Sequence, residues 1–335
     1  MLHAVFPQAP APSTKRPTPR SRIYQLVQQM VIATLLLMAI GSATRVMNAG
    51  LACPDWPLCY GQWVPARQMN LQVFLEWFHR LDAALLGVLT IVLAASSWGY
   101  RRDLPRWAPW LASLALGLIV VQGALGGLTV TELLRFDIVT AHLGTALLFF
   151  VTLLILATVL MPYQAVGTAT KLPWLGLTAT ILVYLQCLLG GLVASRWAAH
   201  QCFAGFQLCE VMNSHLLGVF PPTIATLVSV VAAWRTPALH PTLRQAANLA
   251  LVFLLLQIGI GIATFRLHLQ VELLTVTHQA IGALLLGSLT VLTALAWRDV
   301  QSQVGSVVPM TPNPVIPRGI ATDPALDSLE SSPVP

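Results

Sequence analysis

The sequence predicts an all-α polytopic membrane protein with eight transmembrane helices, and two observations support this fold class. Hydrophobic residues make up 56% of the 335-residue chain and charged residues 9%, and the mean hydropathy is +0.74. A soluble domain carries about 25% charged residues, because its surface faces water. Eight separate segments are also apolar over the length of a membrane span. The composition excludes an ordinary soluble enzyme, a disordered protein and a collagen-like chain.

A helical span needs roughly 20 mostly apolar residues. Such segments occur at 24–45, 76–98, 108–130, 138–161, 174–195, 211–234, 246–266 and 273–297. The runs lack the period-two alternation of barrel strands, so helices are favoured. The basic, proline-rich segment 1–23 and the proline- and serine-rich segment 298–335 are predicted to be disordered tails.

The distribution of basic residues predicts that both chain ends are cytoplasmic. With the N-terminus inside, twelve of the 18 Lys and Arg residues fall on the cytoplasmic side and six on the outer side, as the positive-inside rule requires. This topology accounts for the pI of about 9.4 without a nucleic-acid partner. The first span also imitates a signal peptide. Its cleavage would leave seven spans and place the basic loops outside, so we expect an uncleaved span.

Four histidines within the predicted spans mark an internal duplication. The interval between His79 and His142 is the same as that between His215 and His278. It follows that each histidine of the first pair precedes its counterpart in the second pair by the same distance along the chain. We therefore expect two four-helix halves, 24–161 and 174–297, joined by a cytoplasmic linker at 162–173.

A second repeated pattern lies in the odd-numbered spans. Three of them carry a glutamine four residues before a glycine: Gln122 with Gly126, Gln186 with Gly190, and Gln257 with Gly261. The first span has Leu37 and Gly41 instead. Residues four apart share a helix face, and glycine lets a helix or a flat ligand approach closely. Helix packing alone and ligand contact both explain the pattern.

The depth of the four histidines predicts haem ligation. Each lies in the first turns of an even-numbered span, so the four rings are expected at similar depth near the outer surface. Ionisable residues inside a membrane are costly and usually functional, and histidine is a common axial ligand of haem iron. Packing histidines are the alternative, and the long spacings disfavour bare zinc. We expect one bis-histidine haem site in each half.

Four of the five cysteines lie in matching outer loops. Cys53 and Cys59 fall in the first outer loop and Cys202 and Cys209 in the third. Cys187 lies alone inside the fifth span, where we expect a small apolar filler. Disulfides persist on the oxidising side of a membrane, so we expect the bonds Cys53–Cys59 and Cys202–Cys209. Structural staples are one interpretation; redox chemistry at a stiff, exposed first pair is the other.

Glu76 distinguishes the two halves. It precedes His79 by three residues and shares its helix face, whereas the residue at the same position before His215 is Met212. The asymmetry indicates chemistry in the first half and a held cofactor in the second. A solvated helix N-terminus is the alternative explanation. Arg80 is a candidate to pair with haem propionates.

These residues carry a resemblance to a known family. The chain is similar to haem A synthases of the cysteine-containing bacterial type over roughly residues 24–297. The matching pieces are Thr44-Arg45, Cys53-Pro54-Asp55-Trp56-Pro57-Leu58-Cys59-Tyr60-Gly61, Glu76-Trp77-Phe78-His79-Arg80, and then His142, His215 and His278.

The resemblance implies oxidation of the C8 methyl group of haem O to a formyl group, giving haem A for terminal oxidases. It implies substrate haem O at His79 and His142, haem b at His215 and His278, and Glu76 as the essential carboxylate. Arg45 and Arg80 become candidate propionate contacts. The implied partners are haem O synthase and an electron donor, and the implied location is a bacterial cell membrane, with the haem sites near its extracytoplasmic side.

Two functions from other classes remain open on the residues alone. A bis-histidine cytochrome b that exchanges electrons with quinone would explain the four histidines, but not a carboxylate in one half only. A membrane disulfide-forming protein would explain the outer cysteines and leave the histidine repeat unused.

Overall fold

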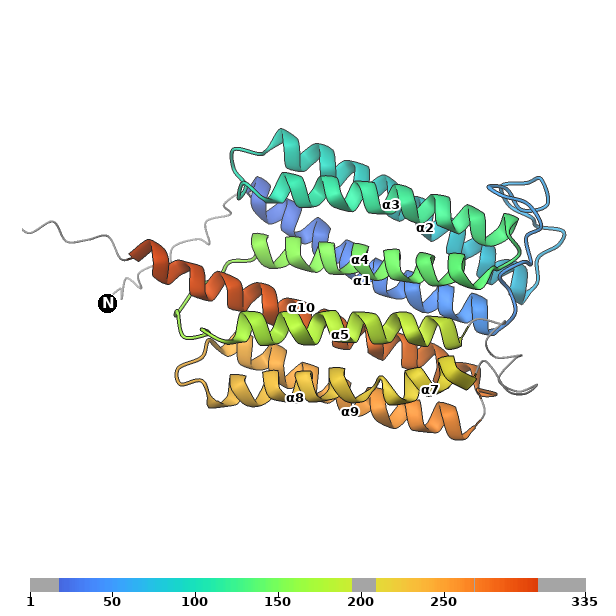
Figure 1. Ribbon diagram of the computed structural model, residues 1–335. Helices are drawn as coiled ribbons and strands as arrows, with labels where there is room; N and C mark the ends of the chain where they lie inside the picture. Colours follow the sequence, from blue (N-terminus) through green and yellow to red (C-terminus); the bar gives the residue numbers. More distant parts are fainter. Residues whose placement is uncertain (1–17, 195–208, 268, 307–335) are drawn as a thin grey trace, which may run out of the picture.

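The computed structural model describes residues 18–194, 209–267 and 269–306, and in this part the chain is all helical, without strands. Eight spans in it are long and apolar enough to cross a membrane, which confirms the predicted fold class. Figure 1 shows the helices lying side by side with their loops gathered at two ends. The helices are α1 (Pro19–Val46), α2 (Leu71–Gly99), α3 (Ala108–Thr131), α4 (Phe136–Leu160), α5 (Leu172–Val193), α7 (Cys209–Leu217), α8 (Phe220–Arg235), α9 (Pro241–Arg266) and α10 (Glu272–Ser306).

The sixth span is broken, where the sequence had predicted one helix over 211–234. Helix α7 ends at Leu217 and α8 begins at Phe220. Pro221 and Pro222 have no backbone N–H, so neither can donate the helical hydrogen bond to the residue four positions earlier. The break follows His215 within one turn of helix.

Two large hydrophobic clusters form most of the core of the described residues, and a small third one lies around Cys53, Cys59 and Val73. One draws its buried side chains mainly from α1 to α4, and the other from α5 to α10 with a few from α1 and α4. Helix α4 serves both, since Phe149 belongs to the first cluster and its neighbour Phe150 to the second. Figure 1 agrees, with α1 to α4 in the upper part and α5 to α10 in the lower part.

Helix α10 continues nine residues beyond the predicted end at 297, into the segment expected to be a disordered tail. Asp299 lies in this extension and is fully buried. Its carboxylate accepts hydrogen bonds from the backbone N–H groups of Val166 and Ala169 at 2.8 and 3.1 Å and from the Tyr163 hydroxyl at 3.0 Å. Burial, together with this carboxylate, raises the pKa of Tyr163. A charge that ends an apolar run therefore anchors the loop between α4 and α5.

Candidate haem-binding site

Each intramembrane histidine packs against a glycine of the preceding span. A Cβ atom added at the glycine would lie 2.8–3.3 Å from the histidine Cε1 in every case, closer than ordinary van der Waals contact. The pairs are Gly41 with His79, Gly126 with His142, Gly190 with His215 and Gly261 with His278. Because these four glycines, which the sequence pattern identified, have no side chain, they leave room for the histidine rings.

Three of the histidines are also contacted by a glutamine. The Gln122 Nε2 atom lies 3.3 Å from His142 Nε2, and Gln257 Nε2 lies 3.2 Å from His278 Nε2. Gln186 Nε2 lies 3.1 Å from Nδ1 of His215. The sequence pattern located these glutamines without indicating their partners, which lie on different helices. A carboxamide beside the ring is the kind of group that fixes the orientation of a metal-binding histidine.

His215 and His278 face each other across the C-terminal half. Their ring centres are 6.5 Å apart and the ring planes are inclined at 83°. Two imidazoles bound to one metal through metal–nitrogen bonds of about 2.0–2.1 Å have ring centres roughly 6–6.5 Å apart. The separation therefore fits two axial ligands of one haem iron.

Ring nitrogens are also available for a metal. Among the described residues, the buried Nδ1 atoms of His79, His142 and His278 have no hydrogen-bond partner. No three His, Cys, Asp or Glu side chains gather into a site for a bare metal ion in the described part of the chain, whereas a porphyrin supplies the remaining ligands of its iron.

Glu76 is buried, with 4% of its surface exposed, which contradicts the solvated-helix explanation. Its Oε2 atom accepts a hydrogen bond of 2.8 Å from the backbone N–H of Cys53. Its Oε1 atom accepts one of 2.6 Å from Arg80. The carboxylate is thus held between its own helix and the first outer loop, three residues before His79.

Arg80 is directed toward the loop. Its Nη1 atom donates to the backbone oxygens of Asp55 and Leu58 at 2.7 and 2.6 Å, and its Nη2 atom to that of Cys53 at 3.4 Å. With the bond to Glu76, both terminal nitrogens are fully engaged. The contact of Arg80 with a haem propionate stays a prediction, and in this structure its terminal nitrogens bind the loop and Glu76.

The first predicted disulfide, Cys53–Cys59, is present. Its cysteines are 0% and 2% exposed, whereas the redox interpretation assumed an exposed pair. The Asp55 carboxylate accepts hydrogen bonds from the backbone N–H groups of Tyr60 and Gly61 and closes the same loop. A structural staple therefore fits better than a redox pair.

Two other cysteine predictions have different outcomes. The predicted pair Cys202–Cys209 lies outside the residues whose side chains are described. Cys187 is a free, partly buried cysteine packed against the second hydrophobic cluster, as expected of an apolar filler.

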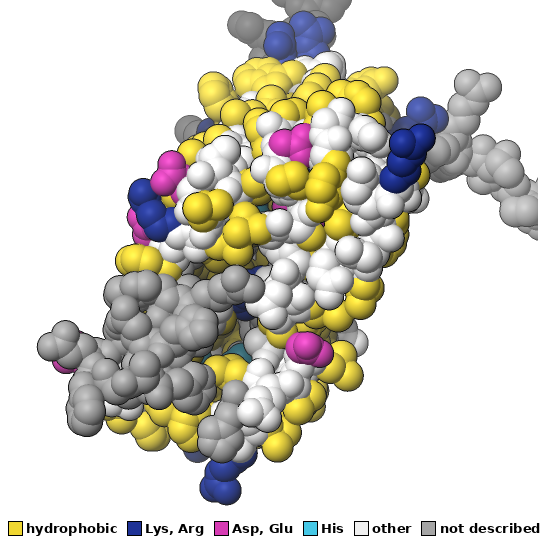
Figure 2. All heavy atoms as spheres, turned by 90° about the vertical axis from the view of Figure 1, so that its right-hand side faces the viewer, with side chains coloured by type: hydrophobic (Ala, Val, Ile, Leu, Met, Phe, Trp, Pro, Cys, Tyr) yellow, Lys and Arg dark blue, Asp and Glu magenta, His cyan; other side chains and the backbone are white. Residues whose placement is uncertain are grey.

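Arg45 links the two halves. Its Nη2 atom donates a 3.0 Å hydrogen bond to Gln279 Oε1, directly after His278. The side chain of this α1 residue thus reaches α10. Figure 2 views the molecule from the end that carries these residues, and histidine atoms are visible there between the other side chains.

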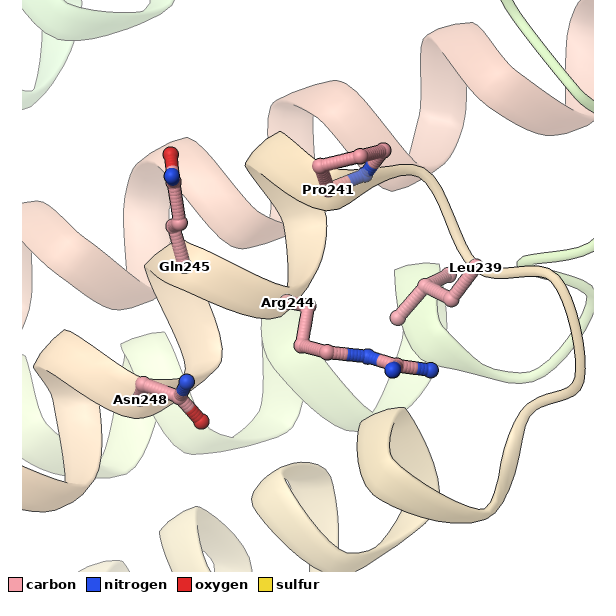
Figure 3. A pocket seen from close by; sticks show the side chains of 5 residues that line it. All are labelled: Leu239, Pro241, Arg244, Gln245 and Asn248. Carbon is pink, nitrogen blue, oxygen red and sulfur yellow. The ribbon is translucent and has the colours of Figure 1, made fainter.

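A pocket of about 260 Å³ lies at the other end of the molecule. It sits at the start of α9 (Figure 3), lined by Leu239, Pro241, Arg244, Gln245 and Asn248. Gly261, which contacts His278, lies farther along the same helix, about 25 Å beyond Arg244 at the usual helical rise. The pocket is therefore separate from the histidine site.

Comparison with known proteins identifies the family of this chain. The family model for the cytochrome oxidase assembly proteins COX15-CtaA matches residues 24–290, which include all four histidines and Glu76. The chain belongs to the COX15-CtaA family. It is 29% identical over 331 residues to a protein of Shewanella oneidensis named haem A synthase, covering 83% of this chain and 97% of that protein. Haem A synthases of Caulobacter vibrioides and Geobacillus kaustophilus are 27% and 25% identical, covering 82% of this chain and 94% and 91% of their own lengths.

Proposed function

We propose that this protein is a haem A synthase, which oxidises the C8 methyl group of haem O to the formyl group of haem A. One observation carries the proposal beyond family membership. A buried carboxylate, Glu76, is fixed by two hydrogen bonds one helical turn before His79. A cytochrome that only passes electrons has no use for such a group in one half.

The C-terminal half would hold the resident cofactor, haem b, through His215 and His278. The separation of their ring centres, 6.5 Å, supports this role. When bound, haem b supplies electron transfer to or from the substrate site. The glutamines beside both rings orient them, and the glycines behind them leave room for the imidazoles.

The N-terminal half would bind haem O as substrate, with His79 and His142 toward its iron. Oxidation of a methyl group to an aldehyde transfers electrons to an external oxidant, adds an oxygen atom and releases protons, and positive charge develops at the reacting carbon as the electrons leave. Glu76 is the group suited to accept a proton or to stabilise that charge. Each of its oxygens accepts one hydrogen bond from the protein and keeps a lone pair for a further contact.

We propose that the membrane is the bacterial cell membrane and that the histidine end faces its extracytoplasmic side. The excess of basic residues in the opposite loops supports this orientation, as does a disulfide at the histidine end. Haem O synthase and an electron donor are the partners this activity requires. We also propose that the halves 24–161 and 174–297 arose by duplication, which would account for four histidine–glycine contacts of one kind.

The test is expression in a host that makes haem O, followed by chromatography of the extracted haems. The chain should produce haem A, and Glu76→Gln should abolish it while the visible spectrum of bound haem b persists. Glu132→Gln is the matched control, because Glu132 lies at the same end in an exposed ion pair with Arg135. A Glu76→Gln protein that makes normal amounts of haem A would place the chemistry elsewhere.

A further inference from the structure

The four histidine–glycine pairs differ in one side chain. In α3, α5 and α9 a glutamine stands four residues before the glycine and contacts the histidine ring. In α1 the corresponding residue is Leu37. Among the residues that the structure describes, His79, which packs on Gly41, is therefore the one histidine of the four without a glutamine beside it.

The other surroundings of this ring match those of two others. The buried Nδ1 atom of His79 has no hydrogen-bond partner, and the same holds for His142 and His278. The missing carboxamide is thus the difference between the sites.

Leucine cannot replace that carboxamide, because its side chain has neither a donor nor an acceptor. Leu37 packs instead against the first hydrophobic cluster. Turned with its oxygen toward the ring, such a carboxamide accepts the N–H of the nitrogen that does not bind the metal. Partners that accept in this way orient a metal-binding histidine and make it a stronger ligand, and their removal typically costs about 10–100-fold in metal affinity. His79 should therefore be the weakest of the four ligands.

We propose that Leu37 makes His79 the exchangeable axial ligand, which allows haem O to enter the N-terminal half and haem A to leave it. This proposal rests on the proposed function. A cofactor must be retained, and both ligands of the C-terminal pair have a glutamine. A substrate must be exchanged, and in the N-terminal pair only His142 has one. Leu37 is a positioning residue that acts through His79.

The test is Leu37→Gln, which supplies the missing carboxamide with little change in side-chain volume. The full-length protein is purified from a host that makes haem O, and transfer of its haems to an excess of a soluble apo-haem protein is followed by chromatography. Loss of haem O and haem A should be about 10–100-fold slower than in the unaltered protein. Loss of haem b should be unchanged.

The control is Leu36→Gln, which adds the same group one residue earlier, where the side chain is 57% exposed. It should leave the exchange rates unchanged. Equal rates for Leu37→Gln and the unaltered protein would overturn the proposal, as would equal slowing by Leu36→Gln.

If Leu37→Gln does not fold, the reciprocal variant Gln122→Leu tests the proposal instead. It should speed the loss of haem O and haem A and leave haem b in place, and unchanged rates would again overturn the proposal. Failure of the proposed function gives a different result. The unaltered chain would then produce no haem A in cells, whatever the exchange rates of its bound haems.

Discussion

The carboxylate of Glu76 and the guanidinium of Arg80 form an ion pair of 2.6 Å one turn apart on α2, with side chains 5% and 16% exposed. The same guanidinium binds three backbone oxygens of the disulfide loop. The carboxylate proposed for catalysis and the loop above it are therefore one hydrogen-bonded unit.

Replacing Arg80 should remove the partner of the Glu76 carboxylate and the hydrogen bonds that hold the disulfide loop on α2. In Arg80→Leu the Glu76 carboxylate stays buried without its partner, which costs about 3–5 kcal/mol when a buried pair is broken. We expect a lower unfolding temperature and a loss of haem A formation. The control Arg135→Leu breaks an exposed pair worth about 0–1 kcal/mol and should change neither. Normal haem A yield from Arg80→Leu would show that Glu76 needs no such support.

Thiol labelling tests the cysteine predictions, including the pair whose side chains the structure does not describe. If Cys53–Cys59 and Cys202–Cys209 are both disulfides, alkylation without reductant should label only Cys187, and only after unfolding. The first bond closes a short loop and should contribute roughly 2–3 kcal/mol by loop-closure entropy. Labelling of a second cysteine in the unfolded, unreduced protein would contradict the second pairing.

Sidedness is tested by reporter fusions at the two ends of the helices. Arg67 and Arg102 are exposed residues in the loops that precede and follow α2. A reporter at Arg102 should be active only in the cytoplasm, and one at Arg67 only outside, because the basic residues concentrate in the loops at the Arg102 end. The reverse result would invert the proposed orientation and place the histidine end inside.

Asp299 should be essential for stability although it lies outside the predicted spans. Asp299→Leu would leave the N–H groups of Val166 and Ala169 and the Tyr163 hydroxyl without their acceptor. Of these residues Ala169 is fully buried, and an unsatisfied buried group costs about 1–3 kcal/mol. We expect a clearly lower unfolding temperature. Asp103→Leu, in the loop between α2 and α3, changes an exposed carboxylate and serves as the control. Equal unfolding temperatures would rule out the anchoring role.

The fold could be read from the sequence because apolar length alone specifies membrane helices. The break after Leu217 follows from Pro221 and Pro222 but was missed, since these residues lie within a strongly apolar run. The extension of α10 was missed because it contains charged residues. A charge normally ends a span, and nothing local to Asp299 indicates the donors that the loop between α4 and α5 brings to it.

The site was only partly predictable. The equal spacing within the two pairs identified the histidines, and the register of Glu76 against Met212 identified the asymmetry. The partners of these residues depend on packing between helices, so the contacts of Gln122 and of the other glutamines could not be read from the pattern. The direction of Arg80 likewise depends on how the disulfide loop folds over α2.

The packing of histidine on glycine gives the last prediction, which compares two glycines of α9. A Cβ added at Gly261 would lie 2.9 Å from the His278 Cε1 atom, whereas one added at Gly259 has no neighbour within 4 Å. Gly261→Ala should therefore displace the ring of an axial ligand and reduce bound haem b. Gly259→Ala should keep haem b and gain slight stability, because alanine favours a helix over glycine by about 1 kcal/mol.

Visible spectra of the two purified variants measure this difference, with haem content expressed per protein. Because both substitutions add the same methyl group to the same helix two residues apart, a general effect on helix stability or insertion would act on both alike. Equal haem b content would contradict the expected displacement of His278 from the iron. A loss confined to Gly261→Ala would tie haem retention to the contact between this glycine and its histidine.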